Sequence, residues 1–215
     1  TAEQLGALAR SEPVIQPLVT RNTQSVAVFG IIAVHVPRAF FVKQLSQFAQ
    51  SLETPERSGF GIFATPATLA DARGLAIPAK DLSALRACRS GACEFKIPAA
   101  DMAKVRAILE SEGEGGAAKA SAYARARVVE YVNAYRLRGN AAMVVYDDRG
   151  SEGVRASDAF GALLADSPYL QQNAPALHQY LLGAPGKRPE GATDVIYWTR
   201  EEMGGLRSTL LINHT

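Results

Sequence analysis

The most continuous apolar stretch of the chain runs from Val26 to Val36 and predicts a β-strand over residues 23–36. Its apolar residues divide between the two faces of the strand: Val26, Val28, Ile32, Val34 and Val36 on one, and Ala27, Phe29, Ile31 and Ala33 on the other. Because both faces are apolar, we expect a layer of protein to cover each of them. Gly30 marks a bulge, a bend or the close approach of another backbone.

A helix is expected directly after this strand, since Pro37 suits the first turn of a helix. The apolar stripe of that helix consists of Phe41, Leu45, Phe48 and Leu52. Further helices are expected at residues 79–87, from Pro98 onward, at 118–138, from Ser157 onward and at 174–182. Further strands are expected at residues 58–64, 94–97, 141–146, 194–199 and 206–213.

This order of elements favours the α+β class, with an antiparallel sheet and packed helices. We expect a single domain over residues 1–215, with a helical middle section at about 66–183. The last strand runs straight to Thr215 without a closing turn or cap, so we expect the natural chain to continue.

Composition and charge exclude several classes of protein. The 215 residues are 47% hydrophobic, which is enough to build a core and argues against disorder. The 23 basic residues nearly balance the 21 acidic ones, and they are scattered, so we expect no nucleic-acid partner. The densest basic group is Arg125, Arg127, Arg136 and Arg138, which we interpret as a solvated helix face. No apolar run approaches the ~20 residues that span a bilayer, so no membrane span is expected.

The two cysteines indicate in which cellular compartment the protein works. Cys88 and Cys93 enclose a short loop with Ser-Gly at its centre, which favours a disulfide and hence an oxidising compartment, periplasmic or secreted. The alternatives are a zinc site, which lacks nearby ligands, a redox pair, which usually has two intervening residues, and two unpaired buried thiols. The chain begins with Thr1, which a cleaved signal peptide or a trimmed sequence would explain.

No catalytic, metal or cofactor motif stands out. The chain has no Gly-x-Ser-x-Gly sequence, and Asp147-Asp148 is typical of a turn. Thr199 and Glu202 have the spacing of a helix-capping pair. Among the histidines, His178 is expected to be satisfied or solvent-tipped, and His214 suggests no role. His35, at the end of the first strand, is the better candidate for a buried titrating group.

Aromatic side chains give the remaining candidates for a binding site. Tyr123, Tyr131 and Tyr135 share one face of the helix at 118–138, where such a stripe most often forms core. The functional interpretation is a lining that offers ring area and hydroxyl groups to an apolar ligand. The residues that we select as candidate ligand contacts are Phe29, His35, Phe41, Tyr131, Tyr135 and Trp198.

Five segments together resemble a family of uncharacterised exported bacterial proteins. They are VAVFGIIAVHVPRAFF, DLSALRACRSGACEFKIP, VVEYVNAYRLRGNAAMVVYDD, SPYLQQNAPALHQYLL and DVIYWTREEMG. The resemblance implies export, and it implies no particular chemistry. The strand-Pro-helix junction from Val34 to Phe41 is also similar to the opening of START-like, helix-grip proteins. Those proteins enclose an apolar ligand between a curved sheet and a long helix, and the middle section here would then be a helical insertion.

The sequence therefore favours a non-catalytic binding protein of the cell envelope, whose ligand is an apolar small molecule or a lipid. A structural or interaction subunit with a protein partner is the first alternative. An enzyme that uses His35 is the second.

Overall fold

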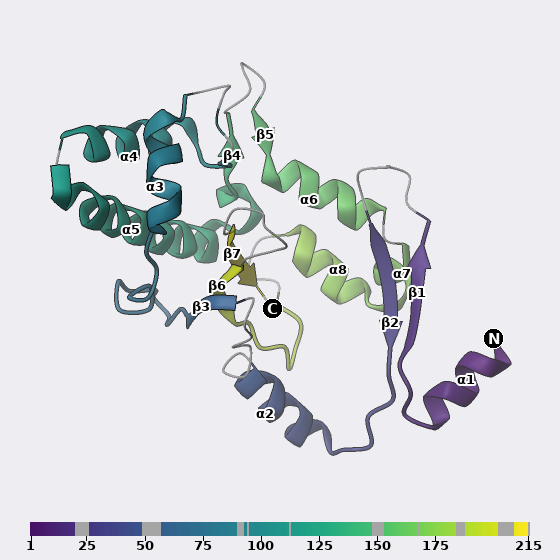
Figure 1. Cartoon of the computed structure of the whole chain (residues 1–215). Coiled ribbons are helices and arrows are strands. Elements are labelled where there is room, and N and C mark those ends of the chain that lie inside the picture. The colour runs from purple at the N-terminus through teal and green to yellow at the C-terminus, as the bar shows by residue number, and fades with distance from the viewer. Residues whose placement is uncertain are drawn as a thin grey trace. The chain divides into compact units, whose positions relative to one another are not determined.

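The structure is a computed structural model, and it divides the chain into two compact units, Thr1–Phe48 and Ala49–Thr215 (Figure 1). It describes residues 1–19, 26–48, 57–89, 93, 95–111, 113–147, 153–166, 168–183, 188–201 and 209–214. Each unit is described by itself below. The expectation of a single domain over residues 1–215 stays a prediction.

The N-terminal unit consists of two helices and a hairpin. Its elements are α1 (Ala2–Ala9), β1 (Val14–Leu18), β2 (Ala27–Ile31) and α2 (Arg38–Phe48). Thr1 and Gln4 form a capping box at the start of α1, which satisfies backbone N–H groups that a helix leaves open. β1 and β2 pair in antiparallel fashion, with Val14 opposite Ile31.

The expected burial of the first long strand is wrong. β2 covers only five residues, residues 32–36 follow it without regular structure, and Phe29 and Ile32 are 38% and 51% exposed. None of the described side chains in residues 1–48 is buried. An apolar pattern predicts burial only where the fold supplies covering layers, and this unit provides a single five-residue partner strand.

The larger unit confirms the α+β class, with an antiparallel sheet packed against helices. Its helices are α3 (Ala79–Ala87), α4 (Ala99–Ser111), α5 (Gly116–Arg138), α6 (Ala156–Ala165), α7 (Pro168–Asn173) and α8 (Pro175–Leu182). Its sheet has the order β3 (Arg57–Ile62), β6 (Ile196–Glu201), β7 (Thr209–His214). A separate pair is formed by β4 (Val145–Tyr146) and β5 (Val154–Arg155), and single 3-10 turns lie at Gly113–Gly115 (η2) and Gly139–Ala142 (η3).

Three local predictions are wrong, each for a physical reason. Phe95 and Ile97 are not in a strand, because they pack against a helical cluster instead of a partner strand. Residues 139–142 form the turn η3, which leaves only two residues of the expected strand in β4. Thr199 does not cap a helix, since it lies buried inside β6.

Helix α5 carries both hydrophobic clusters of this unit. Its N-terminal half contributes Ala120 to a cluster with Leu85, Val105 and Leu109 of α3 and α4. Its C-terminal half contributes Val132 to a cluster with Phe63, Ala67, Ala72, Leu75, Ile196 and Trp198. Figure 1 shows α3 and α4 beside one half of the helix and the three-stranded sheet near the other.

A row of polar side chains on α5 holds the irregular segment 63–77. Ser121 Oγ accepts from the N–H of Ile77 at 3.0 Å, and Arg125 donates to the carbonyl of Leu75 at 2.9 Å. The amide of Asn133 makes two bonds to Ala67, accepting from its N–H at 2.8 Å and donating to its carbonyl at 3.0 Å.

The next member of the row is Arg136, which donates to the carbonyls of Phe63, at 2.9 Å, and Ala64. The interpretation of Arg125 and Arg136 as a solvated face is therefore wrong. Both guanidinium groups satisfy backbone carbonyls of a loop without regular structure.

The predicted disulfide is confirmed. Cys88 caps the C-terminus of α3 and is bonded to Cys93, with the two sulfur atoms 2.04 Å apart. Among the described residues, no helix combines the length and the apolar character needed to cross a membrane.

Trp198 explains the glycines of β3. Its indole N–H donates to the carbonyl of Asp71 at 3.0 Å, and its ring lies against Gly59, Gly61 and Gly74. A β-carbon at Gly61 would lie 2.7 Å from the oxygen of Asp71 and would overlap the indole nitrogen. The side-chain-free face of β3 therefore accommodates the largest buried side chain of the unit.

We expect Gly61→Ala to lower the free energy of unfolding by about 1–3 kcal/mol, because the added methyl group overpacks this contact. The matched control is Gly161→Ala in α6, where a β-carbon meets nothing within 4 Å. That change should raise stability by up to about 1 kcal/mol, since alanine favours a helix interior over glycine. Urea unfolding of both variants measures the difference, and equal effects would contradict the packing argument.

Candidate functional site

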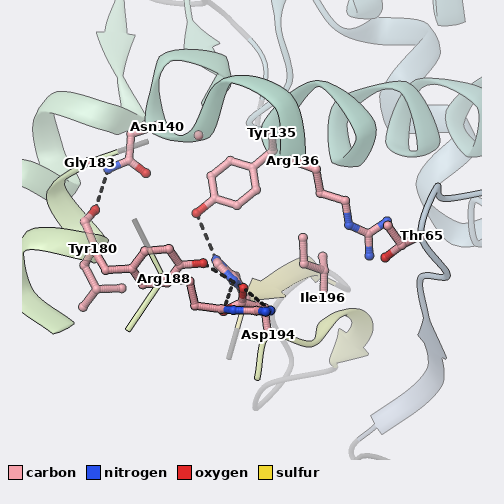
Figure 2. A pocket seen from close by; sticks show the side chains of 12 residues that line it. Thr65, Tyr135, Arg136, Asn140, Tyr180, Gly183, Arg188, Asp194 and Ile196 are labelled. Atoms are coloured by element: carbon pink, nitrogen blue, oxygen red, sulfur yellow. Dashed lines mark hydrogen bonds and ion pairs between the residues drawn. The ribbon is translucent and has the colours of Figure 1, made fainter. Parts of the chain in front are cut away.

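A pocket of about 270 Å³ lies in the larger unit, where α5, α8 and the sheet meet (Figure 2). Its lining consists of Thr65, Tyr135, Arg136, Gly139, Asn140, Tyr180, Leu181, Gly183, Arg188, Asp194, Ile196 and His214. Five segments that are far apart in sequence therefore contribute: the loop after β3, the end of α5 with the turn that follows it, the end of α8, residues 188–196 up to the start of β6, and the last residue of β7.

Asp194 is the centre of a polar cluster in this pocket. Its Oδ2 accepts from the hydroxyl of Tyr180 at 2.9 Å and lies 3.5 Å from a guanidinium nitrogen of Arg188. Its Oδ1 lies 3.3 Å from Nε2 of His214. The other ring nitrogen, Nδ1, lies 3.1 Å from the hydroxyl of Tyr135. Figure 2 shows Tyr135, Tyr180 and Arg188 pointing toward Asp194 from different parts of the chain.

The two tyrosines of the cluster are held in their neutral form. Burial, followed by the hydrogen bond to Asp194 and its negative charge, raises the pKa of Tyr180 to about 12. Burial and then the charge of Asp194 also raise the pKa of Tyr135 above its ordinary value. Both phenols therefore keep their protons at neutral pH and act as hydrogen-bond donors.

Backbone contacts fix the wall of the pocket. Asn140 follows α5 and donates from its amide to the carbonyl of Leu181 at 2.7 Å, which ties α5 to α8. Gly139 ends α5 with a φ of 57°, a conformation that glycine adopts without strain, and confirms the predicted end of that helix. The pocket is therefore bounded by segments that are bonded to one another.

A second pocket of about 180 Å³ adjoins the first and is mostly apolar. Its lining consists of Tyr131, Val132, Tyr135, Met143, Phe160, Leu181, Ile196, Ile212 and His214. Four of these residues also line the larger pocket: Tyr135, Leu181, Ile196 and His214. The two hollows are thus neighbouring compartments, one polar and one apolar.

The structure places the six predicted ligand contacts in three different settings. Tyr131 and Tyr135 line the compartments. Trp198 is buried in the core cluster beside β3. Phe29, His35 and Phe41 lie in the N-terminal unit, and all three are exposed.

Sequence reasoning missed most of the polar cluster. Tyr180, Arg188, Asp194 and His214 share no motif, because their spacing follows from tertiary structure and not from a helix or turn. His178, two residues from Tyr180, is neither satisfied nor solvent-tipped as expected. It is 5% exposed, and its Nδ1 finds no hydrogen-bond partner among the described residues.

Comparisons with protein-family models, with curated proteins and with solved structures found no match to this chain. The resemblances to exported bacterial proteins and to helix-grip proteins therefore stay predictions. Within the described part of the chain, no group of three or more His, Cys, Asp or Glu residues could hold a metal ion.

The cluster predicts a loss of stability at alkaline pH that depends on Tyr180. Because its pKa is about 12 in the folded protein and about 10 in an unfolded chain, the folded state binds this proton more tightly. The resulting stabilisation is complete below pH 10 and is lost as the pH rises toward 12.

We therefore expect Tyr180→Phe to cost about 1–2 kcal/mol at pH 8, since the bond to Asp194 is lost. Between pH 9 and pH 11, the free energy of unfolding of this variant should fall less than that of the unmodified protein. Urea unfolding across this range measures both effects, and parallel curves for the two proteins would contradict the assignment.

Proposed function

We propose that this protein binds a small amphipathic molecule, with an anionic head group in the larger compartment and a short apolar tail in the smaller one. The observation that carries the proposal is that the two compartments adjoin and share Tyr135, Leu181, Ile196 and His214. Ligand sites of this kind are mostly apolar, with a few polar groups that fix orientation.

The charges of the larger compartment favour an anion. Arg136 and Arg188 supply two positive charges, whereas Asp194 supplies one negative charge. Each guanidinium has five N–H donors, and the bonds described here leave donors on both arginines for a ligand. A carboxylate or phosphate would accept from them.

The smaller compartment favours an apolar tail. Met143, Phe160 and Ile212 present only apolar atoms and a thioether, and Tyr131 adds a half-buried ring. Burial raises the pKa of Tyr131, so this phenol stays uncharged. At about 180 Å³ the space suits a short or medium chain and is too small for a whole membrane lipid.

We also propose that the protein works in an oxidising compartment, the periplasm or the exterior of the cell. The Cys88–Cys93 disulfide supports this, because such bonds persist where thiols are not kept reduced. Blocking free thiols with an alkylating agent in intact cells, before lysis, tests the proposal. Alkylation of both cysteines would contradict it.

A second candidate function is interaction with a protein partner through the N-terminal unit. It is favoured by the exposed apolar side chains of that unit, among them Val28, Ile32 and Phe40. Sedimentation velocity over a range of concentrations tests the simplest case, association with a second copy. A monomer throughout that range would count against that case.

Binding of octanoate and of octanol separates the two parts of the ligand proposal. We expect octanoate to bind, and we expect Arg188→Gln to weaken it about 10-fold, because a charge-assisted hydrogen bond is lost. Octanol should bind both proteins equally, since its head group carries no charge. Isothermal titration calorimetry measures the four affinities.

Arg138→Gln is the matched control, because Arg138 is an exposed arginine at the end of α5 that does not line either compartment. It should leave the affinity for octanoate unchanged. Equal losses in the two arginine variants would show a general charge effect and would contradict an anion site at Arg188. No binding of octanoate at all would overturn the proposed function.

A further inference from the structure

The contacts from Tyr135 through His214 to Asp194 depend on which ring nitrogen of the imidazole carries its proton. Nε2 of His214 lies 3.3 Å from Oδ1 of Asp194 in an ion-pair contact, and a negative carboxylate favours a proton on the ring nitrogen that faces it. In a neutral imidazole the other nitrogen, Nδ1, is then an acceptor. With the proton on Nε2, the hydroxyl of Tyr135, 3.1 Å from Nδ1, is the donor to His214.

This order of hydroxyl, imidazole and carboxylate is the order that activates nucleophilic hydroxyl groups. The base must remove the proton as the new bond forms, since burial keeps the free phenol of Tyr135 neutral. His214 is within reach to do so, and distances slightly above 3 Å are common before a ligand binds.

Asp194 is fixed in place to support a positive charge on His214. The hydroxyl of Tyr180 and the guanidinium of Arg188 both contact its Oδ2, which leaves Oδ1 aimed at the imidazole. An imidazolium formed at this position would be paired with a carboxylate that is already oriented. Asp194 is thus a positioning residue, and it does not itself react.

Tyr135 and His214 also line both compartments, so they lie at the boundary between the apolar and the polar hollow. An ester whose acyl chain occupies the apolar compartment would place its carbonyl carbon at that boundary. We propose that Tyr135 is a nucleophile that accepts the acyl group of such a carboxylic ester, with His214 as its general base. This inference rests on the proposed function, because it needs the same ligand orientation.

The steps balance without an oxidant or a cofactor. Tyr135 Oη bonds to the carbonyl carbon while its proton moves to His214 Nδ1. The bond from that carbon to the leaving oxygen then breaks, and Nδ1 returns the proton to the leaving alcohol. Water attacks the resulting acyl-tyrosine with His214 again as base, which releases the carboxylic acid and restores the phenol. An aryl ester is a reactive acyl carrier, so this last step needs no further activation.

The test uses p-nitrophenyl esters with acyl chains of two to eight carbons and the intact protein. We expect p-nitrophenolate to appear faster than in buffer, with a preference for chains that fill the apolar compartment. After an acid quench, peptide mass spectrometry should find the acyl group on Tyr135. Tyr135→Phe should lower the rate about 100-fold or to that of buffer.

Tyr123→Phe is the matched control, because Tyr123 lies on the same helix and donates to a carboxylate, Asp101, at 2.6 Å, but lines neither compartment. It should leave the rate unchanged. His214→Ala should abolish the reaction, and added imidazole should restore part of it, which a structural role of His214 would not allow.

Two outcomes overturn the inference and leave the proposed function standing: octanoate binds but no ester is cleaved, or the acyl group is found on residues other than Tyr135. A rate that Tyr135→Phe does not change overturns it as well. If the protein neither binds octanoate nor cleaves any ester, the proposed function fails together with the inference.

Discussion

The larger unit depends on how the backbone of residues 63–77 is satisfied. This segment joins β3 to α3 without regular structure of its own, yet Phe63, Ala67, Ala72 and Leu75 are buried. Buried N–H and C=O groups are costly without partners. Side chains of α5 supply several of them, from Ser121 near one end of the helix to Arg136 near the other, and Trp198 and Arg200 of β6 supply others. The segment is thereby held between helix and sheet, and the position of α5 over β6 follows from it.

The geometry of the site follows from the way α5 is bonded to residues 63–77. Tyr135 and Arg136 are neighbours in sequence, and they face different partners. Arg136 donates hydrogen bonds to the carbonyls of Phe63 and Ala64, whereas the hydroxyl of Tyr135 contacts His214 at the end of β7. The bonds of Arg136 fix the rotation of α5 about its own axis. Since successive side chains are about 100° apart around that axis, the direction in which the Tyr135 side chain points is fixed as well. The irregular segment 63–77 therefore helps to orient the candidate nucleophile.

Local patterns predicted local structure, and the site is not local. Ala79 to Ala87 was expected as a helix and is one, and the six-residue span from Cys88 to Cys93 forms the expected disulfide. Tyr131 and Tyr135 were selected from helical spacing alone. In contrast, Asp194 and His214 belong to segments whose meeting depends on strand pairing, and nothing near them in sequence marks them. The prediction that the apolar run after Val26 is buried on both faces failed for a related reason. Burial depends on other segments that cover the strand, and the run itself does not specify them.

Stability alone does not explain why these polar residues converge. The hydrophobic clusters hold this unit together through α5, and their buried members are all apolar. Among them only Ile196 lines the larger pocket. The side chains of His214 and Asp194 are 24% and 29% exposed, and Arg188 is 52% exposed. Ion pairs with such access to water contribute little to folding. A carboxylate that is contacted by a phenol, a guanidinium and an imidazole at the edge of a hollow is therefore better explained by what enters the hollow.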